Sequence, residues 1–149
     1  MKVLMSACLA GVNCRYDGTS KDIDLRIKYP GTEFVLVCPE VLGGLSTPRA
    51  SAEISNGKVI NIEGVDVTSA FLKGADAGLK KALKNGCSVA ILKARSPSCG
   101  NGSTYDGSFS GTLIAGDGIF ATALKENNIK VFSEENLNEF EKWLQKCSS

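Results

Sequence analysis

Three cysteines each follow a short apolar segment, and this arrangement constrains the chain more than any other feature. Cys8 comes after residues 3–5, Cys38 after residues 34–37, and Cys99 shortly after residues 89–92. Short apolar segments that stop at glycine, proline or serine are typical of buried strands. The carboxyl ends of parallel strands meet at one edge of a sheet, where ligands of α/β proteins bind. The sequence therefore predicts that these three thiols lie close together.

The segments between the cysteines alternate between strand and helix patterns. We expect strands at residues 2–7, 33–37, 87–93 and 129–132, and helices at residues 20–29, 66–85 and 118–127. This alternation favours one α/β domain spanning residues 1–149, with a three-layer, mostly parallel, Rossmann-like sheet. Its 149 residues, 43% of them apolar, are enough to bury a substantial core.

Two helices have an apolar face that can be predicted from spacing. In the helix at 66–85 the expected buried stripe is Leu72, Ala75, Leu79, Ala82 and Leu83. A last helix should follow Ser133, which we expect to be its N-cap, with Glu134 and Glu135 in the first turn. Its expected buried stripe is Leu137, Phe140, Leu144 and Cys147.

Two segments interrupt the strand and helix alternation. Residues 52–62 alternate around Asn56-Gly57, a strong hairpin signal, so we expect a small antiparallel excursion there. Residues 100–118 are polar and rich in glycine, and they are too long for a simple connection. We expect this second segment to be a binding loop that folds over a site.

Charge and composition narrow the class of partner. The net charge is +1 and no polybasic tract is present, so the sequence gives no support for nucleic-acid binding. The apolar start of the chain is too short for a signal peptide or a membrane span, which favours a cytoplasmic protein. In that reducing compartment the six cysteines are expected to serve ligation or catalysis rather than disulfides.

The absence of histidine limits the chemistry further. It excludes mixed Cys/His zinc sites and every imidazole acid or base. Three cysteines in one crevice could hold zinc or an iron-sulfur cluster, supply a nucleophile, or lie there without a metal, and spacing alone leaves these alternatives open. Cys87 and Cys147 are expected to be packed thiols. Cys14 could be a fourth ligand, a resolving thiol or a neighbour without a role.

Other polar residues accompany the three cysteines. Each cysteine loop has an arginine nearby, and Arg15, Arg49 and Arg95 could stabilise thiolates or an anionic ligand. Glu40, two residues after Cys38, could serve as a general base or acid, or simply pair with Arg49. Ser98 could donate a hydrogen bond or relay a proton, or it could be purely structural.

Three motifs in order resemble the bacterial 2-thiouracil desulfurase family, catalogued as a domain of unknown function. They are SACLAGVNCRYDG at residues 6–18, CPEVLGGLSTPR at residues 38–49 and KARSPSCG at residues 93–100. The resemblance covers nearly the whole chain. It implies a small α/β protein that holds a [4Fe-4S] cluster on Cys8, Cys38 and Cys99, with one iron left open.

The resemblance also implies an activity. The sulfur of a small thiolated pyrimidine would bind the open iron, water would add to the ring carbon, and 2-thiouracil would become uracil without net redox change. Glu40 would activate the water and Ser98 would assist. The alternative is a non-catalytic iron-sulfur or zinc module, such as a sensor, with Cys14 as fourth ligand.

Overall fold

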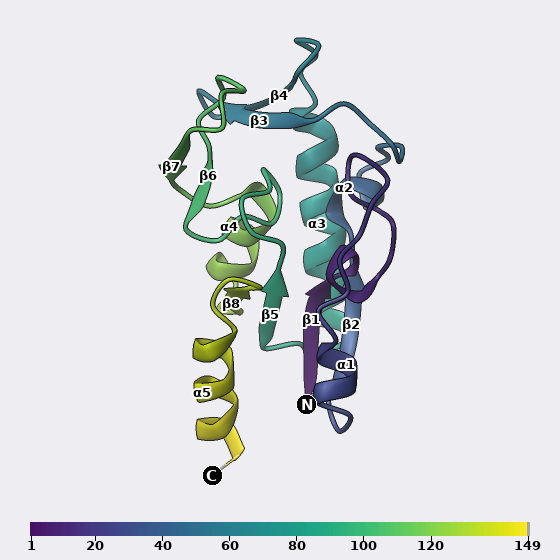
Figure 1. The fold of residues 1–149 in the computed structure, drawn as a ribbon, viewed down its shortest axis with the longest axis vertical. Coiled ribbons are helices and arrows are strands. Elements are labelled where there is room, and N and C mark those ends of the chain that lie inside the picture. Colours follow the sequence, from purple (N-terminus) through teal and green to yellow (C-terminus); the bar gives the residue numbers. More distant parts are fainter. Residues whose placement is uncertain (149) are drawn as a thin grey trace.

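The computed structural model describes residues 1–148, built around a four-stranded parallel sheet (Figure 1). The strand order is β2-β1-β5-β8, with β1 at Lys2–Ser6, β2 at Glu33–Val37, β5 at Val89–Leu92 and β8 at Lys130–Ser133. The sheet is wholly parallel, and the last residues of β1 and β2, Ser6 and Val37, are directly paired. The expected α/β architecture is confirmed.

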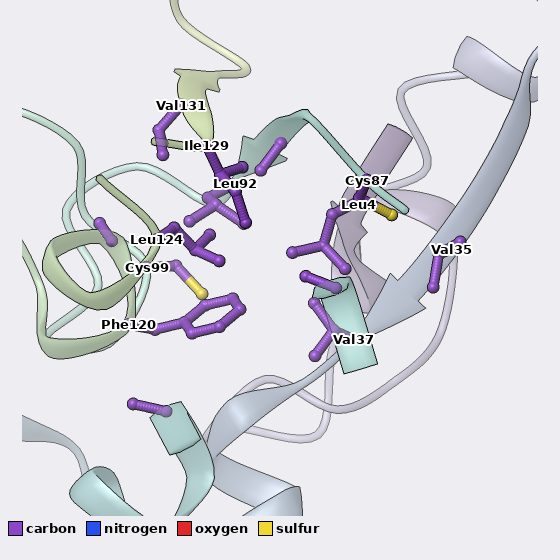
Figure 2. Close-up of a cluster of buried hydrophobic side chains, with 14 residues drawn as sticks. Leu4, Val35, Val37, Cys87, Leu92, Cys99, Phe120, Leu124, Ile129 and Val131 are labelled. Atoms are coloured by element: carbon purple, nitrogen blue, oxygen red, sulfur yellow. The ribbon is translucent and has the colours of Figure 1, made fainter. Parts of the chain in front are cut away.

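Helices cover both faces of the sheet. Helices α3 (Thr68–Lys84) and α4 (Ile119–Glu126) pack on one face, where Phe120 and Leu124 meet Leu4 and Leu92 (Figure 2). The other face is covered by the 3-10 helix η1 (Ala7–Ala10), α1 (Leu25–Lys28) and α5 (Leu137–Ser148). Successive side chains of a strand point to opposite faces, so β1 and β5 supply apolar residues to both layers. The burial of residues 3–5 in β1 and of all of β5 explains why these segments are continuously apolar.

Helix α3 buries a different stripe from the expected one. Leu72 and Leu83 are 54% and 53% exposed, and the fully buried side is Phe71, Gly74, Ala75, Gly78 and Ala82. Gly74 lies against the backbone of Pro39 in α2 (Pro39–Leu42), and a Cβ at Gly78 would lie 2.7 Å from the ring of Phe120. The prediction was wrong for Leu72 and Leu83 because α3 packs by close backbone approach rather than through its largest side chains.

Two antiparallel hairpins extend beyond the sheet. The strands β3 (Ala52–Ser55) and β4 (Lys58–Asn61) form the hairpin expected around Asn56-Gly57. The strands β6 (Ser103–Tyr105) and β7 (Leu113–Ala115) form a second hairpin inside the predicted binding loop. Both hairpins lie at the end of the molecule toward which β1 and β5 run, opposite α5 (Figure 1). This placement brings them over the ends of the strands that precede the cysteine loops.

The remaining differences from the sequence predictions lie at helix ends. Helix α1 is shorter than expected, with only Leu25–Lys28 helical. Ser133 ends β8 instead of capping α5, and its hydroxyl accepts the N–H of Glu135 in the intervening turn. Cys147 is exposed rather than packed, whereas Cys87 is buried as expected.

None of the helices in residues 1–148 is both long and apolar enough to cross a membrane.

Candidate active site

A cavity of about 520 Å³ opens beyond the carboxyl ends of β1, β2 and β5. Four of the six cysteines line it, namely Cys8, Cys14, Cys38 and Cys99. Its wall also includes Glu40, Lys93 and the arginines singled out in the sequence, Arg15, Arg49 and Arg95. The structure therefore brings the three cysteine loops together, as the strand-end argument predicted.

Cys8 and Cys14 come from the loop that follows β1. Cys8 lies in η1, which begins directly after Ser6, and the loop then returns so that Cys14 is buried beside it. The Cys14 thiol is hydrogen-bonded to both Cys8 and Cys38. Three sulfurs are thus in direct succession along one side of the cavity.

Cys38 is the residue between β2 and α2. Pro39 opens this short helix, which favours the turn from strand to helix at Cys38. The Cys38 thiol donates to the carbonyl oxygen of Cys14 at 3.7 Å. Gly43, at the end of α2, lies against the backbone of Ala70 in α3 with no room for a Cβ. This contact fixes α2, and with it Cys38, against the long helix.

Cys99 belongs to a tight loop between β5 and β6. The Ser96 hydroxyl accepts the N–H groups of Ser98 and Cys99, both at 3.0 Å. A Cβ at Gly100 would lie 2.7 Å from the carbonyl oxygen of Ser96, so this position requires glycine. The Ser6 hydroxyl donates to the Cys99 sulfur at 3.5 Å and accepts the Lys93 N–H at 2.9 Å. Figure 2 shows that the Cys99 sulfur also lies beside Phe120 in the apolar core.

Burial and hydrogen bonds between thiols raise the pKa of Cys14, Cys38 and Cys99, so these three thiols are protonated when no metal is bound. Burial raises the pKa of Cys99 to about 12. The hydrogen bond with Cys14, followed by burial, raises the pKa of Cys38 far above its ordinary value. For Cys14 the hydrogen bond with Cys38 lowers the pKa, but the Cys8 hydrogen bond and burial outweigh it, and the net shift is upward. A metal that binds these sulfurs must therefore displace their protons.

Glu40 faces the cavity from α2 and is held by Arg49. The Nε of Arg49 donates to Glu40 Oε1 at 3.3 Å, and the two side chains are only 7% and 19% exposed. The other Arg49 nitrogens donate to the Cys14 carbonyl at 2.9 Å, the Ser46 carbonyl and the Thr47 hydroxyl. Arg49 thus joins the carboxylate to the Cys14 loop, which fits a positioning role better than the expected anion binding.

The other two arginines line the cavity with fewer constraints. Arg15 donates to Thr19 within its own loop at 3.5 Å. Arg95 is exposed and pairs with Glu135, and its backbone has a positive φ of 67°, which is unusual for a side chain of this size. A hydrogen bond also links Arg95 to Tyr105. Substrate or anion binding by these two residues stays a prediction.

Ser98 lies next to Cys99 but is not part of the cavity wall. The residue is 1% exposed, and its hydroxyl lies beside the Cys99 sulfur, where it lowers the pKa of that thiol. In the described part of the chain the hydroxyl makes no other hydrogen bond. Its side chain would have to rotate toward the cavity to assist a reaction there.

Sequence reasoning missed several residues of the site. Lys93 pairs with Glu134 at 2.8 Å at the cavity wall, and Glu134 also accepts the N–H of Ala94. The hairpins contribute further lining residues, which are Ala52, Glu53, Ile62, Tyr105, Phe109 and Gly111. The segment at 100–118 was predicted to cover a site, but no individual side chain in it carried a recognisable signal.

The chemistry of the donor set fits a sulfur-ligated metal group. Four soft thiol donors line one cavity, and clusters of iron and sulfur are held by cysteine thiolates. Within residues 1–148, no group of three or more Cys, Asp or Glu side chains is close enough to hold a single metal ion. A cluster takes each thiolate on a different iron, so its ligands need not converge on one point.

Comparison with known proteins gives three matches. Residues 3–136 match the family described as 2-thiouracil desulfurase. The chain is 40% identical over 148 residues to the uncharacterized protein YbbK of Bacillus subtilis (strain 168), covering 92% of this chain and 98% of that protein. It is also similar to the solved structure of the [4Fe-4S]-dependent thiouracil desulfidase TudS, with a TM-score of 0.89, 42% identity and 97% of each chain covered.

Proposed function

Since the chain belongs to the 2-thiouracil desulfurase family, we propose that it removes sulfur from a thiolated pyrimidine, using a [4Fe-4S] cluster on Cys8, Cys38 and Cys99. One observation carries this proposal. Thiols from three separate loops and the carboxylate of Glu40 line the same cavity of about 520 Å³. A cavity of this size is large enough for a small heterocycle beside a metal group.

The residues of the chain divide the work between them. Cys8, Cys38 and Cys99 would hold the cluster, which would supply an iron without a protein ligand as a Lewis acid for the thiocarbonyl sulfur. Glu40 takes the proton from the attacking water, because it is the carboxylate that follows Cys38 into the cavity. Arg49 fixes the direction of that carboxylate through Oε1 and leaves Oε2 for the water. Water addition and C–S cleavage leave uracil without net redox change.

Ser98 is assigned an assisting role. Its hydroxyl lies beside the Cys99 sulfur and can donate to a reacting group after a side-chain rotation. A hydroxyl is neutral, so it can donate a hydrogen bond without placing a charge in a buried site. This role suits a chain without histidine.

Anaerobic reconstitution tests the proposal. We expect about four irons and about four sulfides per chain, and release of uracil from 2-thiouracil by the reconstituted protein. The Cys87→Ser variant is the matched control, because this buried cysteine lies outside the cavity wall. A fully reconstituted protein that converts no thiolated pyrimidine would overturn the proposed activity.

A second candidate is a non-catalytic cluster module with Cys14 as fourth ligand. The observation that favours it is that the Cys14 thiol is hydrogen-bonded to both the Cys8 and the Cys38 thiols. The Cys14→Ser variant separates the two functions. Unchanged iron content and activity support the catalytic cluster on three cysteines, whereas loss of iron supports the four-cysteine module.

A further inference from the structure

The β6–β7 hairpin covers the cavity with side chains that the proposed mechanism does not use. We call residues 103–115 the arm. Tyr105, Phe109 and Gly111 of the arm line the cavity, and Phe109 is half-buried there. The same cavity is lined by the four thiols and Glu40. The arm therefore supplies aromatic side chains to the space in which a small substrate would lie when its sulfur points at the cysteines.

A single carboxylate ties the tip of the arm to the β3–β4 hairpin. Glu53 Oε1 accepts the backbone N–H of Gly107 at 3.0 Å and that of Phe109 at 3.2 Å. Strands β3 and β6 belong to separate two-stranded sheets, so this contact is not part of a strand ladder. Two N–H groups on one charged acceptor make a strong and specific contact, which we call the latch.

The close approach of Gly107 to β3 also stabilises the latch. Its φ is +94°, and a Cβ would lie 2.8 Å from the Ser55 Cβ and 2.9 Å from the Ile54 carbonyl oxygen. Only glycine allows the arm to approach β3 this closely. The carboxylate and the glycine together fix the position of the arm tip.

The backbone of Phe109 is strained in this position. Its φ is +56°, a region that bulky residues rarely adopt. Such strain persists where surrounding contacts hold it, and it is concentrated at binding and catalytic sites. The N–H groups of Gly107 and of Phe109 itself, both bound to Glu53, hold the backbone here, and the Phe109 side chain lines the cavity.

We propose that Phe109 binds the planar ring of the substrate and that Glu53 is the positioning residue that holds Phe109 in place. The inference rests on the proposed function and adds the element that recognises the ring. Aromatic side chains bind nucleobases by stacking, whatever the hydrogen-bonding pattern of the base.

The first test is a split between KM and kcat for 2-thiouracil in the anaerobically reconstituted enzyme. In the Phe109→Ala variant we expect KM to rise by about 10-fold with kcat and iron content unchanged. Phe109→Tyr should restore the wild-type KM, because it keeps an aromatic face. Leu113→Ala is the matched control, since Leu113 is an exposed residue of the arm that does not line the cavity.

The second test concerns the latch. In Glu53→Ala we expect hydrogen exchange at the Gly107 and Phe109 amides to quicken by about 10-fold or more, a change independent of turnover. Its KM should rise as in Phe109→Ala, and the double variant should be no worse than the worse single variant. Glu53→Gln, which keeps an acceptor oxygen, should lie between Glu53→Ala and the wild type.

The outcomes that overturn the inference are distinct from one another. Wild-type KM in Phe109→Ala, in a preparation whose wild-type enzyme turns over, would exclude ring binding by Phe109. Unchanged exchange in Glu53→Ala would exclude the latch. A reconstituted wild type without turnover would overturn the proposed function and the substrate role of Phe109 together, while the exchange measurement would still decide the latch.

Discussion

The cavity has two walls, and the elements that support them differ greatly in how deeply they are buried. The sheet wall consists of Cys8, Cys38, Glu40 and Cys99, and it rests on strands such as β5, in which every residue is buried. The hairpin wall consists of Ala52, Glu53, Ile62, Tyr105 and Phe109, which lie in or next to the two hairpins, and no residue of β3 is fully buried. In β7 all three residues are exposed.

The difference between the walls follows from what each must do. Metal ligands and a proton-transfer group lose function when they are displaced by a fraction of an ångström. A stacking surface tolerates more movement, because every position over the ring gives some contact. We therefore expect substitutions in the sheet wall to abolish or strongly reduce activity, and those in the hairpin wall to change KM modestly.

Cys38→Ser should have the largest effect. Serine provides no soft sulfur donor, so the cluster should be lost and activity should fall below detection. Iron analysis after anaerobic reconstitution checks this, with Cys147→Ser as the exposed control. Full iron content in Cys38→Ser would remove Cys38 from the ligand set.

Glu40→Gln should leave the cluster in place and reduce kcat. Loss of a general base typically costs a factor of about 10²–10⁴. Glutamine keeps the size of the side chain and an oxygen for Arg49 to contact, so the fold should be unaffected. Single-turnover conversion of 2-thiouracil is the measurement, and wild-type kcat would show that another group activates the water.

Arg49→Lys should have a smaller effect on both stability and rate. Lysine cannot reproduce the planar set of donors that reaches Glu40, Cys14, Ser46 and Thr47. We expect the free energy of unfolding to fall by about 1–3 kcal/mol and kcat to fall by about 10-fold. Urea denaturation and steady-state kinetics test this, with Arg26→Lys on α1 as a control. An unchanged rate would confine Arg49 to a structural role.

Ile62→Ser should have the smallest effect. Ile62 lines the cavity but is 60% exposed, so little apolar surface is buried there. We expect the free energy of unfolding to change by less than about 0.5 kcal/mol, and KM for 2-thiouracil to change by less than threefold, within about the range of a weak contact. A loss of rate as large as that of Glu40→Gln would break the distinction between the walls.

The sequence predicted the sheet wall far better than the hairpin wall. Apolar runs that end in loops place Cys8, Cys38 and Cys99 at one sheet edge through topology alone, without detailed packing. Phe109 and Glu53 come together across 56 positions through backbone N–H groups, which leave no trace in side-chain patterns. Their partnership could not have been predicted from local spacing.

Helix packing shows a second limit of pattern reading. Apolar spacing ranked Leu72 and Leu83 as core positions, but both are exposed. The buried side of α3 carries Gly74 and Gly78, which have almost no weight in a hydrophobic pattern. Where a helix packs through glycine, the buried face is chosen by how closely backbones approach.

The glycine contact between α2 and α3 has a consequence for how the site is lost on heating. Gly43 and Gly74 bring backbone against backbone, so no side chain can rearrange to let α2 move while α3 stays folded. The segment with Cys38 and helix α2, which carries Glu40, therefore shares the melting behaviour of the longest helix in the described chain. The catalytic end of the sheet should unfold together with α3 as one cooperative unit, while the arm opens at lower temperature.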